Sequence, residues 1–128
     1  MLVLSRYIAA RYGIESTKSH NITLKGENRH DILIISKNQL VALEGANNYV
    51  AVYYLVNEQL QKKLLRTTLK KIHQQVPDMT QVHRSYLVNK NHFVEWKDNL
   101  SMTLTQLTVP VSKKYKPNLN TLFTVTTK

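Results

Sequence analysis

The chain consists of short stretches with the alternation of β-strands, interrupted by two short stretches with the periodicity of a helix. Between residues 21 and 67, runs rich in Val, Ile, Leu and Tyr are separated by polar turns such as "GENRH" and "VNEQ". Runs of this length and composition, bounded by Asn, Gly and Asp, are typical of strands. The pattern predicts strands at 22–25, 31–35, 40–44, 49–56 and 60–67, arranged as an antiparallel meander.

Helical spacing is found at two later places. Apolar residues recur at intervals of three and four in 69–76, Thr67 or Thr68 can cap the start, and Pro77 prevents continuation. The pattern predicts a helix of about two turns. A second helix is predicted to begin around Lys116–Pro117, because proline is accepted in the first turn of a helix and clashes further inside.

Strand patterning returns after the first helix, in "TQVHR", "FVEW" (93–96) and "LSMTLTQLTV" (100–109). In the last of these, Met102 and Leu104 alternate with hydroxyl residues, which predicts a strand with one solvated face. The fold class is therefore predicted to be mainly β, with one or two short helices. The predicted core includes Tyr53, Tyr86, Leu87, Val88, Trp96 and Leu104.

The N-terminal stretch differs from the rest of the chain. Residues 1–12, "MLVLSRYIAARY", are apolar at helical spacing, and 13–20 are polar and read as a linker. The run is shorter than the roughly 20 residues that span a bilayer. We predict an amphipathic stretch and linker at 1–20, a domain at 21–123 and a tail at 124–128. The stub of a longer upstream region, a packing helix and a dimer contact stay open as roles for the first segment.

Composition narrows the class of function. The 128 residues contain 18 Lys plus Arg against 8 Asp plus Glu, a formal net charge of +10, and no cysteine. This length suits one domain. The excess of positive charge favours a polyanionic partner, namely nucleic acid or an acidic membrane surface. The absence of cysteine removes disulfides, thiolate nucleophiles and sulfur-rich zinc sites, and fits a reducing cytoplasm.

Catalytic and metal chemistry find little support in the sequence. None of the five histidines has a second histidine at the HxxxH spacing, and the acidic residues form no close pair. His83 and Ser85 could supply a base and a nucleophile, but nothing identifies the third, orienting group. The three glycines form no phosphate-binding fingerprint. We predict no catalytic residue, no metal and no cofactor.

Three stretches together carry a family resemblance. They are "LEGANNYVAVY" (43–53), the pair "LLRTTLKKI" and "VHRSYLVNKNHF" within 64–93, and "LTVPVSKKY" (107–115). In this order they resemble the LytTR family of DNA-binding domains, whose pattern has an Asn-Tyr-Val turn, a His-Arg-Ser-Tyr-(Leu/Ile)-Val-Asn signature and a late Pro-Val-Ser-Arg-Tyr segment. The resemblance covers about residues 21–123.

The resemblance implies an elongated, multi-sheet β fold of about ten short strands. It implies that loops, in place of a recognition helix, enter successive major grooves of promoter DNA at paired direct repeats and bend the duplex. Such domains serve bacterial transcription regulators, commonly two-component response regulators, behind a receiver domain or a membrane segment. We therefore expect a cytoplasmic location, or one at the inner face of the membrane, with an upstream sensory region and a homodimer on DNA left open.

The resemblance also assigns the contacts to three loops. The asparagine amides of "ANNY" suit an adenine edge, and the arginine fork of "HRS" suits guanine O6 and N7. In "SKKY", lysine replaces the arginine of the family, and lysine lacks the planar fork. The implied base-contacting residues are Asn47, Asn48, His83, Arg84, Ser112 and Lys113, and the phosphate-contacting residues are Arg66, Lys90 and Lys114.

Each assignment has a structural alternative. The asparagines suit a turn with positive φ, Arg84 could pair with Glu44, Glu95 or Asp98, and His83 could hold its turn through a backbone hydrogen bond. Two other functions also stay open: RNA or general polyanion binding, which needs exposed aromatic residues, and a protein-interaction module that uses the N-terminal stretch. Four lysines are interpreted as solvated faces: Lys62, Lys63, Lys70 and Lys71.

Overall fold

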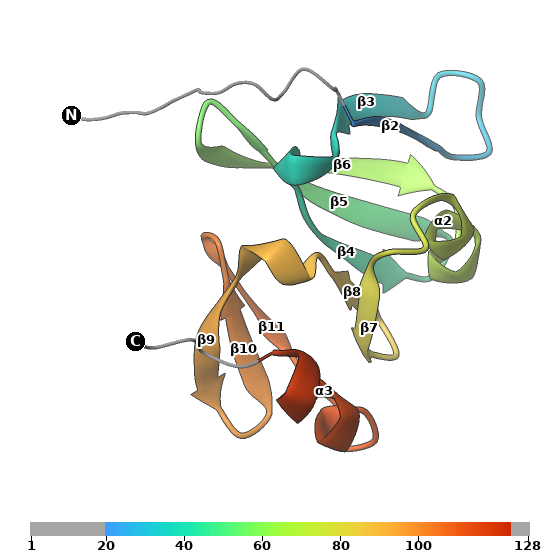
Figure 1. Cartoon of the computed structure of the whole chain (residues 1–128). Helices are drawn as coiled ribbons and strands as arrows, with labels where there is room; N and C mark the ends of the chain where they lie inside the picture. The colour runs from blue at the N-terminus through green and yellow to red at the C-terminus, as the bar shows by residue number, and fades with distance from the viewer. Residues whose placement is uncertain (1–19, 124–128) are drawn as a thin grey trace.

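The computed structural model describes residues 20–123, which form three antiparallel sheets and two short α-helices (Figure 1). The strands are β2 (Asn21–Lys25), β3 (Ile32–Ser36), β4 (Leu40–Ala46), β5 (Tyr49–Val56), β6 (Gln59–Arg66), β7 (Thr80–His83), β8 (Tyr86–Val88), β9 (Phe93–Asp98), β10 (Ser101–Leu104) and β11 (Leu107–Pro110). The helices are α2 (Leu69–Gln75) and α3 (Lys116–Leu122), with short 3-10 turns η2 (Lys37–Gln39) and η3 (Lys90–His92). The prediction of a mainly β fold is confirmed.

The central layer is a five-stranded sheet with the order β6-β5-β4-β8-β7. Its middle strand, β4, is buried at all four positions from Leu40 to Leu43, as expected for a strand covered on both faces. The predicted meander is correct for β4, β5 and β6. It is wrong for β2 and β3, which pair with each other in a separate two-stranded sheet, because strand pairing between distant segments is decided by packing and not by local pattern.

One face of the central sheet is covered by α2 and the β2–β3 pair (Figure 1). Thr68 caps α2 by accepting a hydrogen bond from Lys71 N at 3.2 Å, as predicted. The helix packs close to the sheet at Gly45, where an added Cβ would lie 3.1 Å from Leu69 Cβ. The buried core of this layer consists of Leu24, Ile35, Leu40, Leu43, Val50, Val52, Leu65, Ile72, Val76, Met79 and Leu87.

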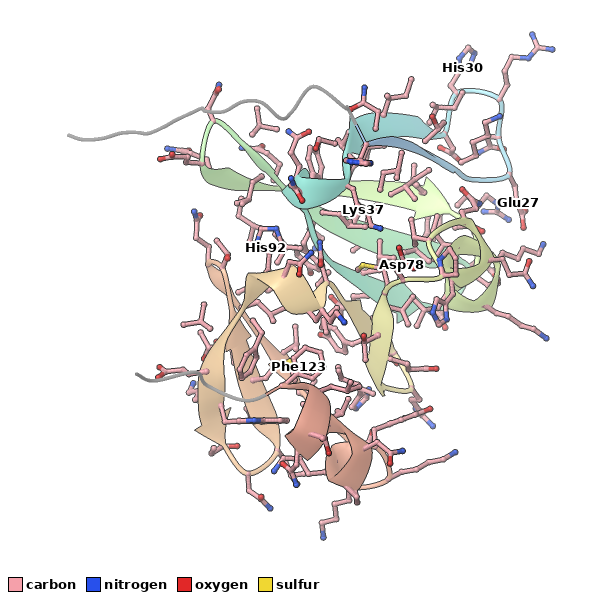
Figure 2. All side chains as sticks on the ribbon, viewed as in Figure 1. Glu27, His30, Lys37, Asp78, His92 and Phe123 are labelled. Carbon is pink, nitrogen blue, oxygen red and sulfur yellow. The ribbon has the colours of Figure 1, made fainter. Side chains whose placement is uncertain are left out.

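The opposite face is covered by the β9-β10-β11 sheet and by α3, which begins at Lys116 with a proline in its first turn, as predicted. Figure 2 shows Phe123 between this helix and the small sheet. The buried core here consists of Val41, Ala42, Val82, Val88, Met102, Leu104, Val109, Val111, Leu119 and Phe123.

The three aromatic residues predicted for the core are only partly buried. Tyr53, Tyr86 and Trp96 pack against the second core cluster. The indole N–H of Trp96 donates to Phe123 O at 2.8 Å, and the hydroxyl of Tyr53 donates to Glu44 Oε1 at 2.8 Å. Each ring therefore lies at the edge of the core, because its polar group needs a hydrogen-bonding partner.

Residues 100–109, predicted as one strand, instead form the β10–β11 hairpin. Leu104 is paired with Leu107, and Gln106 in the turn has φ 60°. The predicted burial of Met102 and Leu104 is correct. The turn was missed because Thr105-Gln106 contains none of the residues that usually mark a two-residue turn. The Gln106 side chain compensates by donating to Glu58 O at 2.7 Å and accepting from Leu60 N at 3.2 Å.

The predictions for residues 1–19 and 124–128 lie outside the described residues. Within 20–123, neither helix has the length and apolar character needed to cross a bilayer.

Candidate nucleic-acid interface

Three turns from distant parts of the sequence meet at one end of the central sheet. They are residues 46–49 between β4 and β5, residues 83–86 between β7 and β8, and residues 111–116 between β11 and α3. We call this region the loop end. In Figure 1 it lies toward the lower right, beyond the ends of β4 and β7.

Two backbone hydrogen bonds join the turns. Gly45 N, at the end of β4, donates to Ser85 O in the second turn at 2.8 Å. Ser112 N, in the third turn, donates to Val82 O in β7 at 2.9 Å. The second turn therefore lies between the other two, and the three turns adjoin.

The first turn contains Asn47 and Asn48, and both are exposed. Asn47 has φ 58°, a left-handed conformation that asparagine tolerates better than most residues. The structural alternative thus accounts for asparagine at 47. It does not account for Asn48, which has no positive φ. Neither side-chain amide makes a hydrogen bond with another residue of the described chain.

The second turn is held by His83. Its Nδ1 accepts a hydrogen bond from Ser85 N at 3.1 Å, and its ring meets Tyr86 edge-on at 5.7 Å. The structure thus contains the alternative predicted for His83, a hydrogen bond to the backbone that holds its turn. In the neutral ring this bond leaves the proton on Nε2. Arg84, at the tip, is exposed, and its guanidinium has no ion-pair or hydrogen-bond partner within residues 20–123.

One predicted partner of Arg84, Glu44, is engaged elsewhere. Its carboxylate accepts the hydroxyl of Tyr53, and Tyr86 lies directly across the strand pair. Burial, followed by the hydrogen bond to Glu44, raises the pKa of both tyrosine hydroxyls to about 12. The predicted pairing of Arg84 with Glu44, Glu95 or Asp98 is not found among the described residues, so the guanidinium stays available.

The third turn leads into α3. Ser112 O accepts hydrogen bonds from Tyr115 N at 3.0 Å and Lys116 N at 3.1 Å, which fixes the turn. Lys113 is exposed, and its side chain has no hydrogen bond, ion pair or ring contact with the described part of the chain, whereas Lys114 Nζ lies 5.6 Å from the centre of the Tyr115 ring. Lys113 is therefore the more available cation of this turn.

Of the predicted phosphate contacts, Arg66 lies beside the first turn. It pairs with Tyr49 across β5 and β6, donates from Nη1 to the Tyr49 hydroxyl at 3.3 Å and lies 5.7 Å from the ring centre. Its Nε is 4.0 Å from Glu27 Oε1. The structure places Arg66 at the loop end, but part of its charge is already compensated.

Lys90 is not brought together with the other predicted residues. It follows Asn89, whose side-chain amide donates to Leu40 O at 2.8 Å. Leu40 is the first residue of β4, and the asparagine turn follows the last residue, Ala46. A strand of that length spans about 20 Å, so Lys90 lies at the end of the sheet away from the three turns.

Beside Arg84, an open hollow of about 540 Å³ separates α2 from β7. Lys70 lines it from the helix side. The sequence contains no signal for this hollow, because the helix and the strand meet only in the folded molecule. No group of three or more His, Asp or Glu side chains arranged to hold a metal ion is found in residues 20–123.

A mainly β scaffold that presents basic and amide side chains on three adjoining turns is the kind of surface that nucleic-acid-binding proteins use. The chain belongs to the LytTr DNA-binding domain family, whose profile matches residues 30–124. Membership implies DNA binding in transcription regulation, and the family is not one of enzymes.

A solved structure has the same fold. It is the LytTr DNA-binding domain of a Bacillus cereus protein described as a methyl-accepting/DNA response regulator. The two share 21% sequence identity with a TM-score of 0.58, over 80% of this chain and 95% of that one. A comparison with curated proteins gave no match.

Proposed function

We propose that the chain is the sequence-specific, double-stranded DNA-binding module of a bacterial transcription regulator and reads the major groove with its three turns. The observation that carries this proposal is the pair of backbone bonds, Gly45 N to Ser85 O and Ser112 N to Val82 O, that set the turns side by side. Because the turns adjoin, their exposed side chains can meet one duplex together.

The turns have a shape that suits the groove. The major groove is about 12 Å wide and admits a two-stranded β-ribbon. The β4–β5 and β7–β8 hairpins are such ribbons, and their tips carry Asn48 and Arg84. An amide can pair with adenine N6 and N7, and a guanidinium with guanine O6 and N7. Neither side chain has to give up a contact within the described residues to do so.

The other predicted residues take supporting roles in this proposal. His83 positions the Arg84 turn, because its Nδ1 already accepts from Ser85 N. Lys113 is a point charge that reaches a guanine or a phosphate, and Lys114 and Arg66 supply phosphate contacts at the margins. We further propose that residues 21–123 are the binding unit and that the target contains paired direct repeats, on which two copies bind.

The test is a fluorescence-anisotropy titration with a duplex obtained by in vitro selection and with a scrambled duplex of equal length. Arg84→Ala is expected to weaken binding to the selected duplex by about 1–3 kcal/mol, or roughly 5- to 150-fold, and to weaken binding to the scrambled duplex much less. Lys90→Ala removes one positive charge at the far end of the sheet and serves as the control.

Equal losses on both duplexes would reduce Arg84 to a phosphate contact and remove the base-reading part of the proposal. Single-stranded RNA in the same assay, at two salt concentrations, tests the alternative of general polyanion binding. Tighter binding to that RNA than to the selected duplex would contradict the proposal.

A further inference from the structure

The hollow beside Arg84 has a polar rim and an apolar floor. Lys70, His73 and Gln74 line it from α2, and Gln81 and Arg84 line it from β7 and its turn. Leu87, which is 1% exposed, lies at the bottom. At about 540 Å³ it lies within the size range of ligand sites. It is open to solvent, so an extended polymer can enter it.

The charge of this hollow is entirely positive. Its lining includes two cations, Lys70 and Arg84, and no acidic residue. Neither cation has an intramolecular partner in the part of the chain that the structure describes. A hollow lined by charges of one sign concentrates ions of the opposite sign, so two unpaired cations facing this hollow favour an anionic occupant.

We propose that the hollow between α2 and β7 holds one sugar-phosphate strand of the bound duplex and that Lys70 contacts its phosphate. The inference rests on the proposed function. A side chain that reads a base edge in a groove about 12 Å wide is flanked by both backbone strands. With Arg84 at the base edges, one of those strands passes along α2, where Lys70 and the Gln74 amide can donate hydrogen bonds to phosphate oxygens.

The adjacent residue offers a matched control. Lys71 has the same side chain on the same helix and is also exposed, but its Nζ lies 3.3 Å from Glu27 Oε2 and it does not line the hollow. If any lysine of α2 served as a general positive charge, Lys70 and Lys71 would be equivalent. In our inference, Lys70 contacts a phosphate and releases counterions from DNA, whereas Lys71 does not.

The first measurement is the salt dependence of binding for the wild-type chain, Lys70→Ala and Lys71→Ala. Losing one phosphate contact lowers the steepness of log Kobs against log[salt] by about 0.9. We expect this decrease for Lys70→Ala, together with equal weakening on selected and scrambled duplexes, and no decrease for Lys71→Ala. Alanine is a good helix former, so neither variant threatens α2, and Lys70→Arg is expected to restore the slope.

The second measurement replaces single phosphates of the selected duplex with uncharged methylphosphonates. One position is expected to weaken binding of the wild-type chain and of Lys71→Ala but to have no further effect on Lys70→Ala. An unchanged slope for Lys70→Ala, or an equal decrease for Lys71→Ala, overturns the inference.

The two proposals fail separately. If Arg84→Ala lowers the preference for the selected duplex while Lys70→Ala keeps the wild-type slope, only the strand in the hollow is rejected. If Arg84→Ala leaves that preference unchanged, base reading is rejected, while the Lys70 slope still decides whether a phosphate strand lies along α2.

Discussion

The two ends of the central sheet use polar side chains in opposite ways. At the loop end, Asn48, Arg84 and Lys113 are exposed, and their side chains make no hydrogen bond or ion pair within residues 20–123. At the opposite end, which consists of residues 36–39, 57–58, 89–92 and 105–106, most polar side chains bond to the protein itself, namely those of Ser36, Lys37, Gln39, Asn89, His92, Thr105 and Gln106. The side chains of Asn57, Glu58 and Lys90 make no hydrogen bond within the described residues. We call this second end the saturated end, because most of its polar side chains are used in bonds within the protein, whereas those of Asn48, Arg84 and Lys113 at the loop end are not.

The saturated end shows what these side chains do when they have only a structural role. His92 contacts Asn38 O at 2.6 Å and Thr105 Oγ1 at 2.9 Å, and the lysine at position 37 pairs with Asp78. Figure 2 shows Lys37, Asp78 and His92 near one another in this part of the molecule. Each bond ties a 3-10 turn or a loop to its neighbour, which closes the end of the sheet.

The loop end is held by backbone bonds instead. Gly45 N and Ser112 N supply the connections. Among the predicted base-contacting residues, all within the described part of the chain, only His83 uses its side chain to fix a turn. Fixing turns through the backbone leaves side chains available while keeping their positions defined, which is the arrangement that a preorganised binding surface requires. Both ends carry polar side chains. What distinguishes the loop end is that Asn48, Arg84 and Lys113 keep donors that are not used within the protein.

The largest expected effect is on the free energy of unfolding, to which the saturated end should contribute more than the loop end. Asn89 is 7% exposed, and its amide donates to Leu40 O and Lys37 O while its oxygen accepts from Asn91 N. Asn89→Ala leaves a buried carbonyl without a donor and is expected to lower the free energy of unfolding by about 3 kcal/mol. Urea denaturation measures this change.

Asn48→Ala is the matched control for that substitution, since it removes the same amide from an exposed position. We expect it to change the free energy of unfolding by less than about 0.5 kcal/mol. A loss as large as that of Asn89→Ala would show that the loop end is closed by side chains after all, and the comparison would fail.

The second prediction concerns affinity for DNA, for which a residue of the loop end is expected to matter although it contributes little to stability. Asn48→Ala is expected to weaken binding to a selected duplex by about 1–2 kcal/mol, roughly 5- to 30-fold. Asn47→Gly keeps the left-handed turn conformation and removes the other amide, so its effect isolates the side chain from the backbone. Titrations at one fixed salt concentration give both values, and an unaltered affinity for both variants would exclude the first turn from the interface.

Much of the fold could be predicted because its signals are local. The threonine cap and Pro77 bound α2, and the position of Pro117 indicates where α3 begins. The β10–β11 hairpin escaped prediction because residues 105–106 are not typical turn residues. The separation of β2 and β3 from the meander escaped because it depends on which hydrophobic faces pack together.

The candidate site could be predicted residue by residue but not as an arrangement. The signature around Arg84 identifies a loop, yet nothing in it shows that Ser85 O bonds Gly45 N, about 40 residues away. For the same reason, the sequence does not show where Lys90 and Lys70 lie in the fold. Lys90 is close to the signature in sequence and lies at the opposite end of the sheet, whereas Lys70 is distant in sequence and shares a hollow with Arg84.

A smaller effect on stability is expected from Tyr53 and Tyr86, the two tyrosines near Glu44 behind the loop end. Their hydroxyl pKa is raised to about 12, so the folded state keeps protons that the unfolded state loses above its ordinary value of 10.0. This contribution is complete below pH 10 and is lost as the pH rises toward 12. Tyr53→Phe should therefore reduce the loss of stability between pH 10 and pH 12, by less than about 1 kcal/mol because the Tyr53 side chain is only partly buried.

Chemical denaturation at pH 9 and pH 11 measures this effect, with Tyr115→Phe as the control outside the Glu44 cluster. Equal slopes for the wild-type chain and Tyr53→Phe would mean that Glu44 does not hold this hydroxyl. In that case Glu44 would be free to neutralise Arg84, and the loop end would lose one of the features that set it apart.

The smallest expected effect concerns the ion pair of the saturated end. A hydrogen bond from Lys37, followed by its charge, holds the pKa of Asp78 below its ordinary value. The resulting stability is present at neutral pH and is lost as the pH falls through that lowered value. Because Asp78 is fully exposed, Asp78→Asn should shift the urea midpoint only slightly at pH 7 in low salt, and less still in acid or in high salt. Its affinity for DNA should match that of the wild-type chain. A loss of affinity comparable to that of Asn48→Ala would place the saturated end against the duplex, which the availability of side chains at the two ends argues against.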